Sequence, residues 1–294
     1  MAMNILLVNS RSRGGEAGYA LVRQELERQG IELAAATLSP RTEDLIQQAR
    51  RYSSERVTIL AGGGDGTLGA IAGELIGKPA RMGVLPMGTG NSFARDLGIP
   101  MEIPAAVEVI AHDVCAAIDV ARVEDRVMLN VATVGLTEAV AQQLTGPLKR
   151  HFGRLAYLWA FPQAYRQLRP FQAEIRSPAG REKLEAIQIV IGNGRFHAGP
   201  FPVTRGASLV SGVLHAYAVR PLPPAEMLRF ALHLPTGAQG AMDAVLSLDE
   251  PWVEVRTDPR RKVIVDGEVC GRTPIRAQSL AGALQVLVPE GFHG

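Results

Sequence analysis

The sequence predicts an α/β domain with a mainly parallel sheet, followed by an antiparallel β domain of the sandwich type. Residues 4–118 alternate between short apolar strands and amphipathic helices, which is typical of a parallel sheet covered by helices on both faces. From about residue 119 the pattern changes to alternating strands separated by short polar turns, which favours an antiparallel sheet. We therefore expect a first domain over residues 1–118, a second over 119–294, and a ligand cleft between them.

The expected elements of the first domain follow from apolar runs and their stop signals. Gly30 ends one expected helix, and Pro104 stands in the first turn of another. In parallel sheets of this kind, ligands bind outside the carboxyl ends of the strands. Strands are expected at 4–9, 31–38, 57–61 and 82–85, and helices at 19–29, 42–52, 68–76 and 103–112.

The second domain is expected to consist of strands with one helical insertion. The insertion, residues 148–170, carries five Lys and Arg residues among aromatic ones. Either its apolar face packs on a sheet while the cations are solvated, or it lies at the membrane surface and meets anionic lipid. Strands are expected at 118–123, 127–133, 171–176, 184–191, 214–219, 252–256, 262–265 and 284–288.

The most informative motif is the turn at 61–68, Ala-Gly-Gly-Gly-Asp-Gly-Thr-Leu, which follows the expected strand at 57–61. Glycines allow backbone N–H groups to approach a ligand closely, and a helix N-terminus after the turn favours phosphate. Asp65 could hold Mg²⁺ or accept a proton; alternatively, it braces the turn. The P-loop and dinucleotide fingerprints are both absent. Candidate phosphate contacts are Gly62, Gly63, Gly64, Asp65, Gly66 and Thr67.

A second turn of the same kind follows the expected strand at 82–85. It has the sequence Gly-Thr-Gly-Asn and precedes another helix that ends at Gly98. Thr67 and Thr89 offer hydroxyl groups, and Asn91 offers an amide. Two such turns can surround one polyphosphate, so Gly88, Thr89 and Asn91 join the candidate nucleotide contacts.

These motifs resemble those of the diacylglycerol/sphingosine-type lipid kinases, especially the soluble bacterial members. The similarity is close at 62–67 and at 85–98, where Leu-Pro-x-Gly-Thr-x-Asn-x-Phe-Ala-Arg-x-Leu-Gly is matched, and it extends over Asn193-Gly194 and Asp266-Gly267-Glu268. The resemblance implies an NAD-kinase-like first domain, ATP and Mg²⁺ as cofactors and a lipid substrate. It also implies that the last residues return to the first domain.

The resemblance also implies roles for individual residues. It assigns the general base to Asp266 or Glu268, a choice that stays open. The two acids flank Gly267 at an expected hairpin tip after the strand at 262–265, and on a strand their side chains would point the same way. Asp65 is then a catalytic residue and the metal ligand. Asn9 and Thr37 match positions expected to contact the nucleotide.

The sequence departs from the family pattern at several positions. Gly69 and Ala70 replace an Asn-Glu pair, and 211–215 reads Ser-Gly-Val-Leu-His where Asp-Gly-x-Leu-Asp is usual. The usual Asp belongs to a structural divalent-metal site in some soluble bacterial members, and neutral Ser211 is a weak ligand, so no second metal is expected. Two alternatives remain: an NAD kinase-like enzyme, and a nucleotide or lipid sensor without catalysis.

Composition narrows the choice of partners and compartment. The formal charge of +2 implies no general affinity for nucleic acid, and no apolar run approaches the length of a membrane span. No basic leader is present, so we expect a cytoplasmic protein. Two further questions stay open: whether it contacts the inner face of the membrane peripherally, and whether it forms a homodimer. Cys115 and Cys270 are expected to be ordinary small core residues without a disulfide or metal role.

Overall fold

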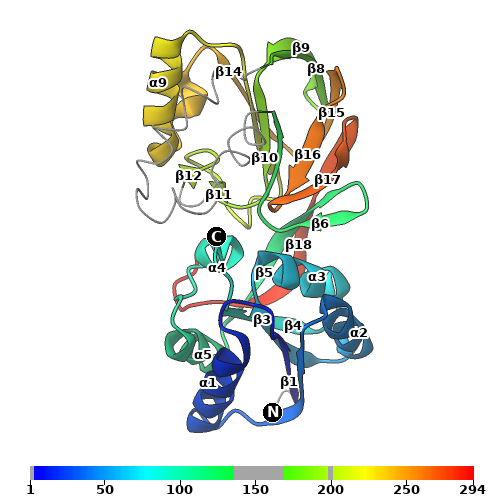
Figure 1. The fold of residues 1–294 in the computed structure, drawn as a ribbon, viewed down its shortest axis with the longest axis vertical. Coiled ribbons are helices and arrows are strands. Elements are labelled where there is room, and N and C mark those ends of the chain that lie inside the picture. The colour runs from blue at the N-terminus through cyan, green and yellow to red at the C-terminus, as the bar shows by residue number, and fades with distance from the viewer. Residues whose placement is uncertain (1–2, 136–168, 198–200) are drawn as a thin grey trace.

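The computed structural model of the chain describes residues 3–135, 169–197 and 201–294, arranged as two lobes (Figure 1). Two strands, β5 (Cys115–Val123) and β18 (Ile275–Leu287), pair with each other and run from one lobe into the other. The two lobes therefore share a sheet. We call the boundary at which the two lobes face each other the seam.

The first domain is a parallel sheet with helices on both faces. Strands β1 to β4 pair in the order β2-β1-β3-β4, and every pair is parallel. Helices α1 and α5 pack together on one face, and α2 and α3 on the other (Figure 1). The elements are β1 (Met3–Asn9), α1 (Gly15–Arg28), β2 (Leu33–Ser39), α2 (Thr42–Tyr52), β3 (Val57–Gly63), α3 (Asp65–Leu75), β4 (Arg81–Pro86), α4 (Ser92–Asp96) and α5 (Ile103–Ala111).

Strand β18 returns to the first domain and extends its sheet. Val286 pairs with Met82 of β4 in parallel, the earlier part of β18 pairs with β15, and β5 pairs with β18 from Ala277 to Leu287. The main path of the sheet has the order β2-β1-β3-β4-β18-β15-β8-β9, and β5 and β6 (Arg126–Met128) pair beside it. The added strands are β15 (Trp252–Asp258), β8 (Phe171–Ser177) and β9 (Gly180–Ala186).

The second domain stacks an antiparallel sheet on this extension. The faces of the two sheets enclose a buried apolar cluster that includes Phe171, Ile189, Ile191, Val253 and Val255. Helix α9 (Pro224–His233) packs on the outer face of the second sheet. The predicted fold class, α/β followed by an antiparallel sandwich, is confirmed. The second sheet has the order β14 (Val245–Glu250), β13 (Leu214–Val219), β10 (Gln188–Gly192), β7 (Val131–Gly135), β16 (Lys262–Val265) and β17 (Glu268–Arg272).

Some expected strands have different bounds. The run 184–191 is two strands, β9 and β10, that belong to different sheets, because the chain changes sheet at Ile187, whose N–H donates to Val219. The run 127–133 is likewise split into β6 (Arg126–Met128) and β7. A continuous buried apolar run hides such a change of sheet, since both strands need apolar residues.

The helical insertion predicted at 148–170 lies outside the described residues up to position 168, so both interpretations of it stay predictions. Among the helices that the structure describes, none has the length and apolar character needed to cross a bilayer. The short remaining elements are β11 (Phe196–His197), β12 (Phe201–Pro202) and two 3₁₀ turns at Leu234–Thr236 and Gln239–Ala241.

Candidate functional site

The two glycine turns lie against each other at the carboxyl ends of β3 and β4. A side-chain carbon built on Gly88 would lie 2.4 Å from the Cα of Gly64, so the two backbones are in direct contact. The N–H of Met87 donates to the carbonyl of Gly63 at 3.0 Å. Because β3 and β4 are parallel neighbours, their turns emerge at the same edge of the sheet. The turns are therefore placed where both can face one ligand.

Asn91 shapes the second turn from within. It adopts a left-handed conformation (φ +49°), and its buried side chain binds both backbone groups of Gly88: Oδ1 accepts the N–H at 2.8 Å, and Nδ2 donates to the carbonyl at 3.1 Å. Thr89 and Gly90 stay exposed at the tip. The tip is therefore the part of this turn that is open to a ligand, while the Asn91 amide is already engaged by both backbone groups of Gly88 and by the Met101 sulfur.

Gly88→Ala should push the two turns apart. A methyl group here meets backbone on one side and the Asn91 amide, at 2.7 Å, on the other, so neither neighbour can move cheaply. We expect a loss of roughly 2 kcal/mol of unfolding free energy, typical of overpacking, measured by thermal or urea unfolding. Gly206→Ala is the matched control, because nothing lies within 4 Å of that position. Equal stability of the two variants would contradict the contact.

Asp65 is the first residue of α3 and joins the two turns. Its Oδ1 accepts the N–H of Phe93 in α4 at 3.0 Å, and a side-chain carbon on Gly90 would lie 3.1 Å from its Oδ2. A carboxylate is favourable at a helix N-terminus. Asp65 therefore makes the bracing contact that was one of its two expected roles, and it remains half-buried beside the tip of the second turn.

Asn9 and Thr67 connect the loop after β1 with the first glycine turn. Asn9 Nδ2 donates to the hydroxyl groups of Thr67 at 3.0 Å and of Thr42 at 3.3 Å, and its Oδ1 accepts the N–H of Arg11. Both Asn9 and Thr67 are buried. Thr37 lies on the edge strand β2, opposite Leu7 and one strand farther from the turns.

Asp266 and Glu268 belong to a tight hairpin rather than to one strand. Asp266 and Gly267 have positive φ values (+47° and +90°) and form the two-residue connection between β16 and β17. The expected hairpin tip is present, but the expectation that both acids point the same way assumed extended backbone, and position 266 is not extended.

The Asp266 carboxylate is held by three backbone donors. Oδ2 accepts the N–H of Leu129 at 2.8 Å, and Oδ1 accepts those of Asn130 at 3.0 Å and Val131 at 2.9 Å. Burial raises the pKa of Asp266, the three N–H groups oppose this, and the negative charge of Asp65 raises the pKa further. The Asp266 carboxylate is thus held in a fixed orientation and lies close enough to Asp65, in the first glycine turn, to interact with its charge.

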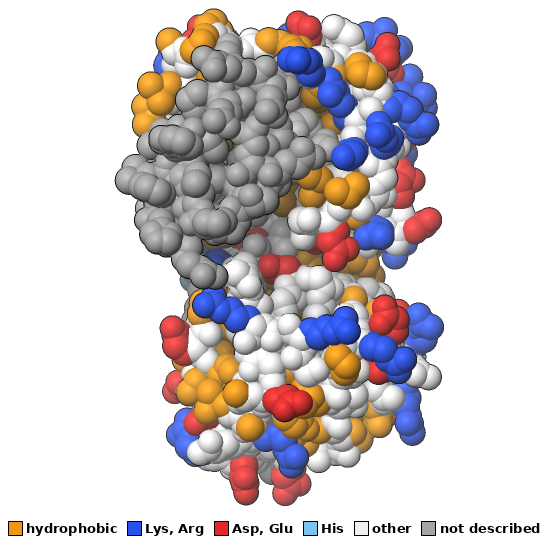
Figure 2. Space-filling model, in the orientation of Figure 1, with side chains coloured by type: hydrophobic (Ala, Val, Ile, Leu, Met, Phe, Trp, Pro, Cys, Tyr) orange, Lys and Arg blue, Asp and Glu red, His pale blue; other side chains and the backbone are white. Residues whose placement is uncertain are grey.

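Glu268 extends toward the first glycine turn from the other domain. A side-chain carbon on Gly66 would lie 3.4 Å from Glu268 Oε1, while Oε2 lies 3.4 Å from Nη1 of Arg126. Both partners of this ion pair are largely exposed. Acidic side chains are visible at the waist between the lobes (Figure 2). The seam therefore brings Glu268 and Asp266 to the side of the turn that carries Asp65.

This acidic seam fits Mg²⁺, which prefers oxygen ligands and binds through one or two carboxylates plus phosphate and water. Burial is the main cause that raises the pKa values of Asp96 and Asp266, and the nearby charge of Asp65 adds to it. Within the described ranges, no group of three or more acidic, His or Cys side chains forms a complete metal site. Phosphate and water would therefore supply the remaining ligands.

The second metal implied by the family does not fit this chain. Ser211 Oγ lies 3.1 Å from His215 Nε2, and His215 Nδ1 lies 2.7 Å from Asp249 Oδ1, so both ring nitrogens are engaged. The backbone N–H of Gly212, next to Ser211, donates to the Asp119 carboxylate. We interpret Ser211, His215 and Asp249 as a hydrogen-bonded chain that holds this loop to the sheet.

Removal of divalent metal should leave the stability of the fold unchanged. A structural ion present at a hundred times its Kd contributes about 2.7 kcal/mol, so its loss would lower Tm by several degrees. We expect the same Tm with and without EDTA, measured without nucleotide. A drop in Tm on chelation that Mg²⁺ or Ca²⁺ reverses would contradict this.

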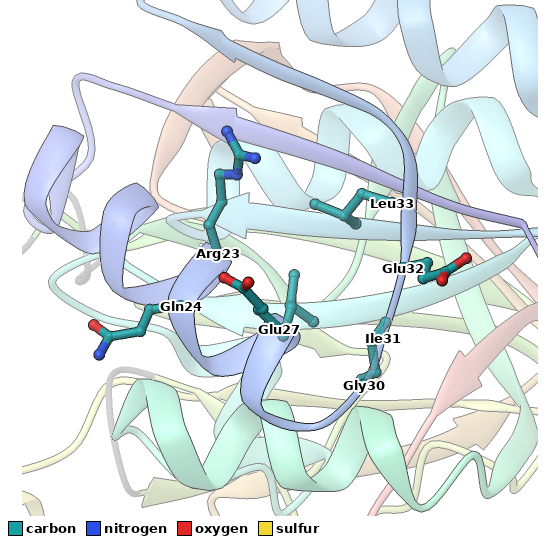
Figure 3. A pocket seen from close by; sticks show the side chains of 8 residues that line it. Arg23, Gln24, Glu27, Gly30, Ile31, Glu32 and Leu33 are labelled. Carbon is teal, nitrogen blue, oxygen red and sulfur yellow. The ribbon is translucent and has the colours of Figure 1, made fainter.

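A cavity of about 750 Å³ lies elsewhere, between the end of α1 and the start of β2 (Figure 3). Arg23, Gln24 and Glu27 line it on the helix side, and residues 30–33 on the strand side. These residues lie at the amino end of the parallel sheet, opposite the glycine turns. The cavity is therefore separate from the site described above.

Sequence reasoning missed Asp96, which α4 places at the seam. Asp96 is almost completely buried and accepts the N–H of Arg195 from the second domain. The available signal in the sequence was an acidic residue close to two apolar residues, Ala94 and Leu97, in an expected helix. Both apolar side chains are buried in the structure. Asn193, noted only as a landmark, is also buried there and donates through Nδ2 to the carbonyls of Asp119 and Leu129.

Comparison with known proteins gives two family matches that together span most of the chain. Residues 4–123 match the diacylglycerol kinase catalytic domain. Residues 130–288 match the YegS C-terminal NAD kinase beta sandwich-like domain.

Relatives named "probable lipid kinase YegS-like" align over most of their length. One from Pseudomonas fluorescens is 33% identical, covering 84% of this chain and 81% of the relative. One from Pseudomonas aeruginosa is 32% identical, covering 98% and 94%. The chain spans 54% of the length of an uncharacterized Synechocystis protein to which it is 31% identical.

Solved structures share the fold. A crystal structure described as a diacylglycerol kinase from Bacillus anthracis aligns with a TM-score of 0.77 at 18% identity, covering 99% of this chain and 98% of that one. At this identity the likeness concerns the architecture of the two domains.

Proposed function

Because the chain belongs to the family of YegS-like lipid kinases with a diacylglycerol kinase catalytic domain, we propose that it transfers the γ-phosphate of ATP to a hydroxyl group of a lipid. Diacylglycerol or a related amphiphile is the proposed acceptor. The observation that carries this proposal is the contact between the two glycine turns, with carboxylates of the second domain facing the first of them.

The turns are proposed to bind the triphosphate through backbone N–H groups and the Thr89 hydroxyl. Gly64 and Gly88 allow the close approach, and the N-terminus of α3 favours phosphate. Mg²⁺ held by Asp65 would neutralise charge on the phosphate oxygens. Asn9, Thr67 and Asn91 are proposed to stabilise the conformation of the loops rather than to contact the phosphates. The hydrogen bonds that they make within and between the loops support this role.

Asp266 is the proposed general base. Its raised pKa favours proton acceptance, and its three N–H partners fix its orientation. It would take the proton of the lipid hydroxyl as that oxygen bonds to the γ-phosphorus and the bond from phosphorus to the leaving oxygen of ADP breaks. Glu268, beside Gly66, is proposed to orient the reacting groups on the nucleotide side.

Incubation with γ-labelled ATP and Mg²⁺ tests this function against the NAD kinase alternative. Parallel reactions contain vesicles with diacylglycerol, vesicles with a sphingoid base, or NAD. We expect label in a lipid product and none in NADP. Label in NADP alone would support the alternative, and binding of ATP without transfer to any extracted lipid would favour a sensor.

A further inference from the structure

Asp96 joins the helix after the second glycine turn to the second domain. It is the last residue of α4 and is only 4% exposed. One carboxyl oxygen accepts the N–H of Arg195 at 3.1 Å, and the other, Oδ2, is buried without a partner at hydrogen-bond geometry in the described part of the chain. The N–H of Phe196 is near enough to favour the charged carboxyl group but does not form a hydrogen bond of that geometry. A carboxyl group in this setting is costly to keep charged.

Gly194 packs directly on this carboxyl group. A side-chain carbon at position 194 would lie 2.2 Å from Asp96 Oδ2, so only glycine allows the approach. We call the contact of Asp96 with Gly194 and Arg195 the Asp96 latch. It connects an element of the first domain with the segment between β10 and β11 of the second.

The latch continues through hydrogen bonds to the proposed base. Asn193, next to Gly194, donates its N–H to the carbonyl of Asn130 at 2.8 Å and its Nδ2 to that of Leu129 at 3.2 Å. The N–H groups of Leu129 and Asn130 are in turn bound by the Asp266 carboxylate. An unbroken path of contacts therefore leads from α4 to Asp266.

The charge on Asp96 depends on few neighbours. Burial raises its pKa to about 7; the N–H groups of Arg195 and Phe196 and the charge of Arg195 oppose this, while the charge of Asp65 raises the pKa. Arg195 faces it from the second domain and Asp65 from α3. Below neutral pH the carboxyl group in the closed latch is therefore mainly protonated.

We propose that Asp96 is a positioning residue: its buried carboxyl group, packed on Gly194 and bound to the Arg195 N–H, closes the latch and so sets where Asp266 stands relative to the second glycine turn. The positioning role rests on the proposed kinase function, whereas the latch itself does not. Asp96 touches neither nucleotide nor lipid in this account and acts through segments 193–195 and 129–131.

The latch should weaken as pH rises, and the sign follows from proton linkage. When the latch opens, Asp96 becomes solvated and its pKa returns to the ordinary value of about 3.9. Opening therefore releases a proton between that value and about 7. The open population should grow by up to roughly tenfold per pH unit across this range and level off above it.

Amide hydrogen exchange of residues 193–196 tests the latch without any activity measurement. With intrinsic exchange corrected, wild-type protection should fall by up to about a hundredfold from pH 5 to pH 7. Asp96→Asn, uncharged and able to accept the Arg195 N–H, should stay protected at both pH values. Asp96→Ala should lose protection at both. Asp243→Asn, which changes an exposed acid of the second domain that also carries residues 193–196, is the control and should match wild type.

Wild-type protection that does not change with pH, or an Asp96→Ala variant as protected as wild type, would overturn the latch. Should Asp96→Ala fail to fold, Gly194→Ala opens the same contact from the other side and should expose the same amides. Protection of residues 193–196 in Gly194→Ala equal to that of wild type would likewise overturn it.

Lipid phosphorylation then tests the positioning role. Below pH 7, where wild-type Asp96 is mainly protonated, we expect Asp96→Ala to lose at least tenfold in kcat with little change in the KM for ATP, and Asp96→Asn to keep wild-type kcat. An unchanged kcat in Asp96→Ala, despite lost protection, would refute positioning. If wild type itself phosphorylates no lipid, the proposed function fails while exchange still decides the latch.

Discussion

Asp65→Asn should reduce phosphoryl transfer by roughly a thousandfold or more, the scale of losing a main electrostatic contribution to the transition state. The substitution keeps an oxygen that can accept the Phe93 N–H. It removes the negative charge proposed to hold Mg²⁺, so the loss separates chemistry from folding.

The folded state should not suffer in this variant. Burial is the main cause that raises the pKa values of Asp96 and Asp266; the charge of Asp65 adds to it, so Asp65→Asn removes one unfavourable interaction with each of these carboxylates in its charged form. We expect an unchanged or higher Tm, measured beside the transfer assay with labelled ATP and lipid vesicles. Asp65→Ala is the comparison, because it also loses the Phe93 contact and should lose stability. Wild-type transfer by Asp65→Asn would remove Asp65 from the mechanism.

Asp266→Asn should abolish transfer to within the limit of detection, a loss of at least about a hundredfold for a general base. It should also destabilise the protein. An amide has one carbonyl oxygen, so its NH₂ group would face one of the N–H groups of Leu129, Asn130 and Val131. An unsatisfied donor of this kind costs about 1–3 kcal/mol.

Glu268→Gln separates the two effects. Glu268 is exposed and its ion pair with Arg126 is solvated, so its substitution should leave Tm unchanged while lowering kcat. The pH dependence of wild-type kcat should also reflect Asp266. Because the pKa of Asp266 is raised, kcat should begin to fall, as the pH is lowered, at a higher pH than for an ordinary aspartate base. Full lipid phosphorylation by Asp266→Asn would show that this carboxylate is not the base.

The parts of the fold that depend on local pattern could be predicted. The apolar run at 57–60 followed by three glycines placed β3 and its turn well, because burial and turn chemistry both act within a few residues. The return of β18 was harder to delimit. Its ladder shifts register between Leu280 and Leu284, with Gly282 at φ +59°, and this interrupts the alternation on which a strand prediction relies.

The candidate site was predictable only in part, because sequence patterns report local structure and not contacts between distant segments. The turns and the Asp-Gly-Glu hairpin were visible as motifs, but the direction of Asp266 depends on its positive φ and on N–H groups more than 130 positions away. Asp96 gave no motif at all. Its role in the seam arises from burial against Gly194, a contact between distant segments that no local pattern encodes.

The two touching turns should bind one Mg·ATP together. Calorimetric titration of Mg·ATP into wild type, Gly88→Ala and the control Gly206→Ala measures this. We expect saturable binding by wild type and the control, and at least tenfold weaker binding when an alanine separates Gly64 from position 88. No binding by wild type, or equal affinity in all three proteins, would show that the turns do not form one nucleotide site.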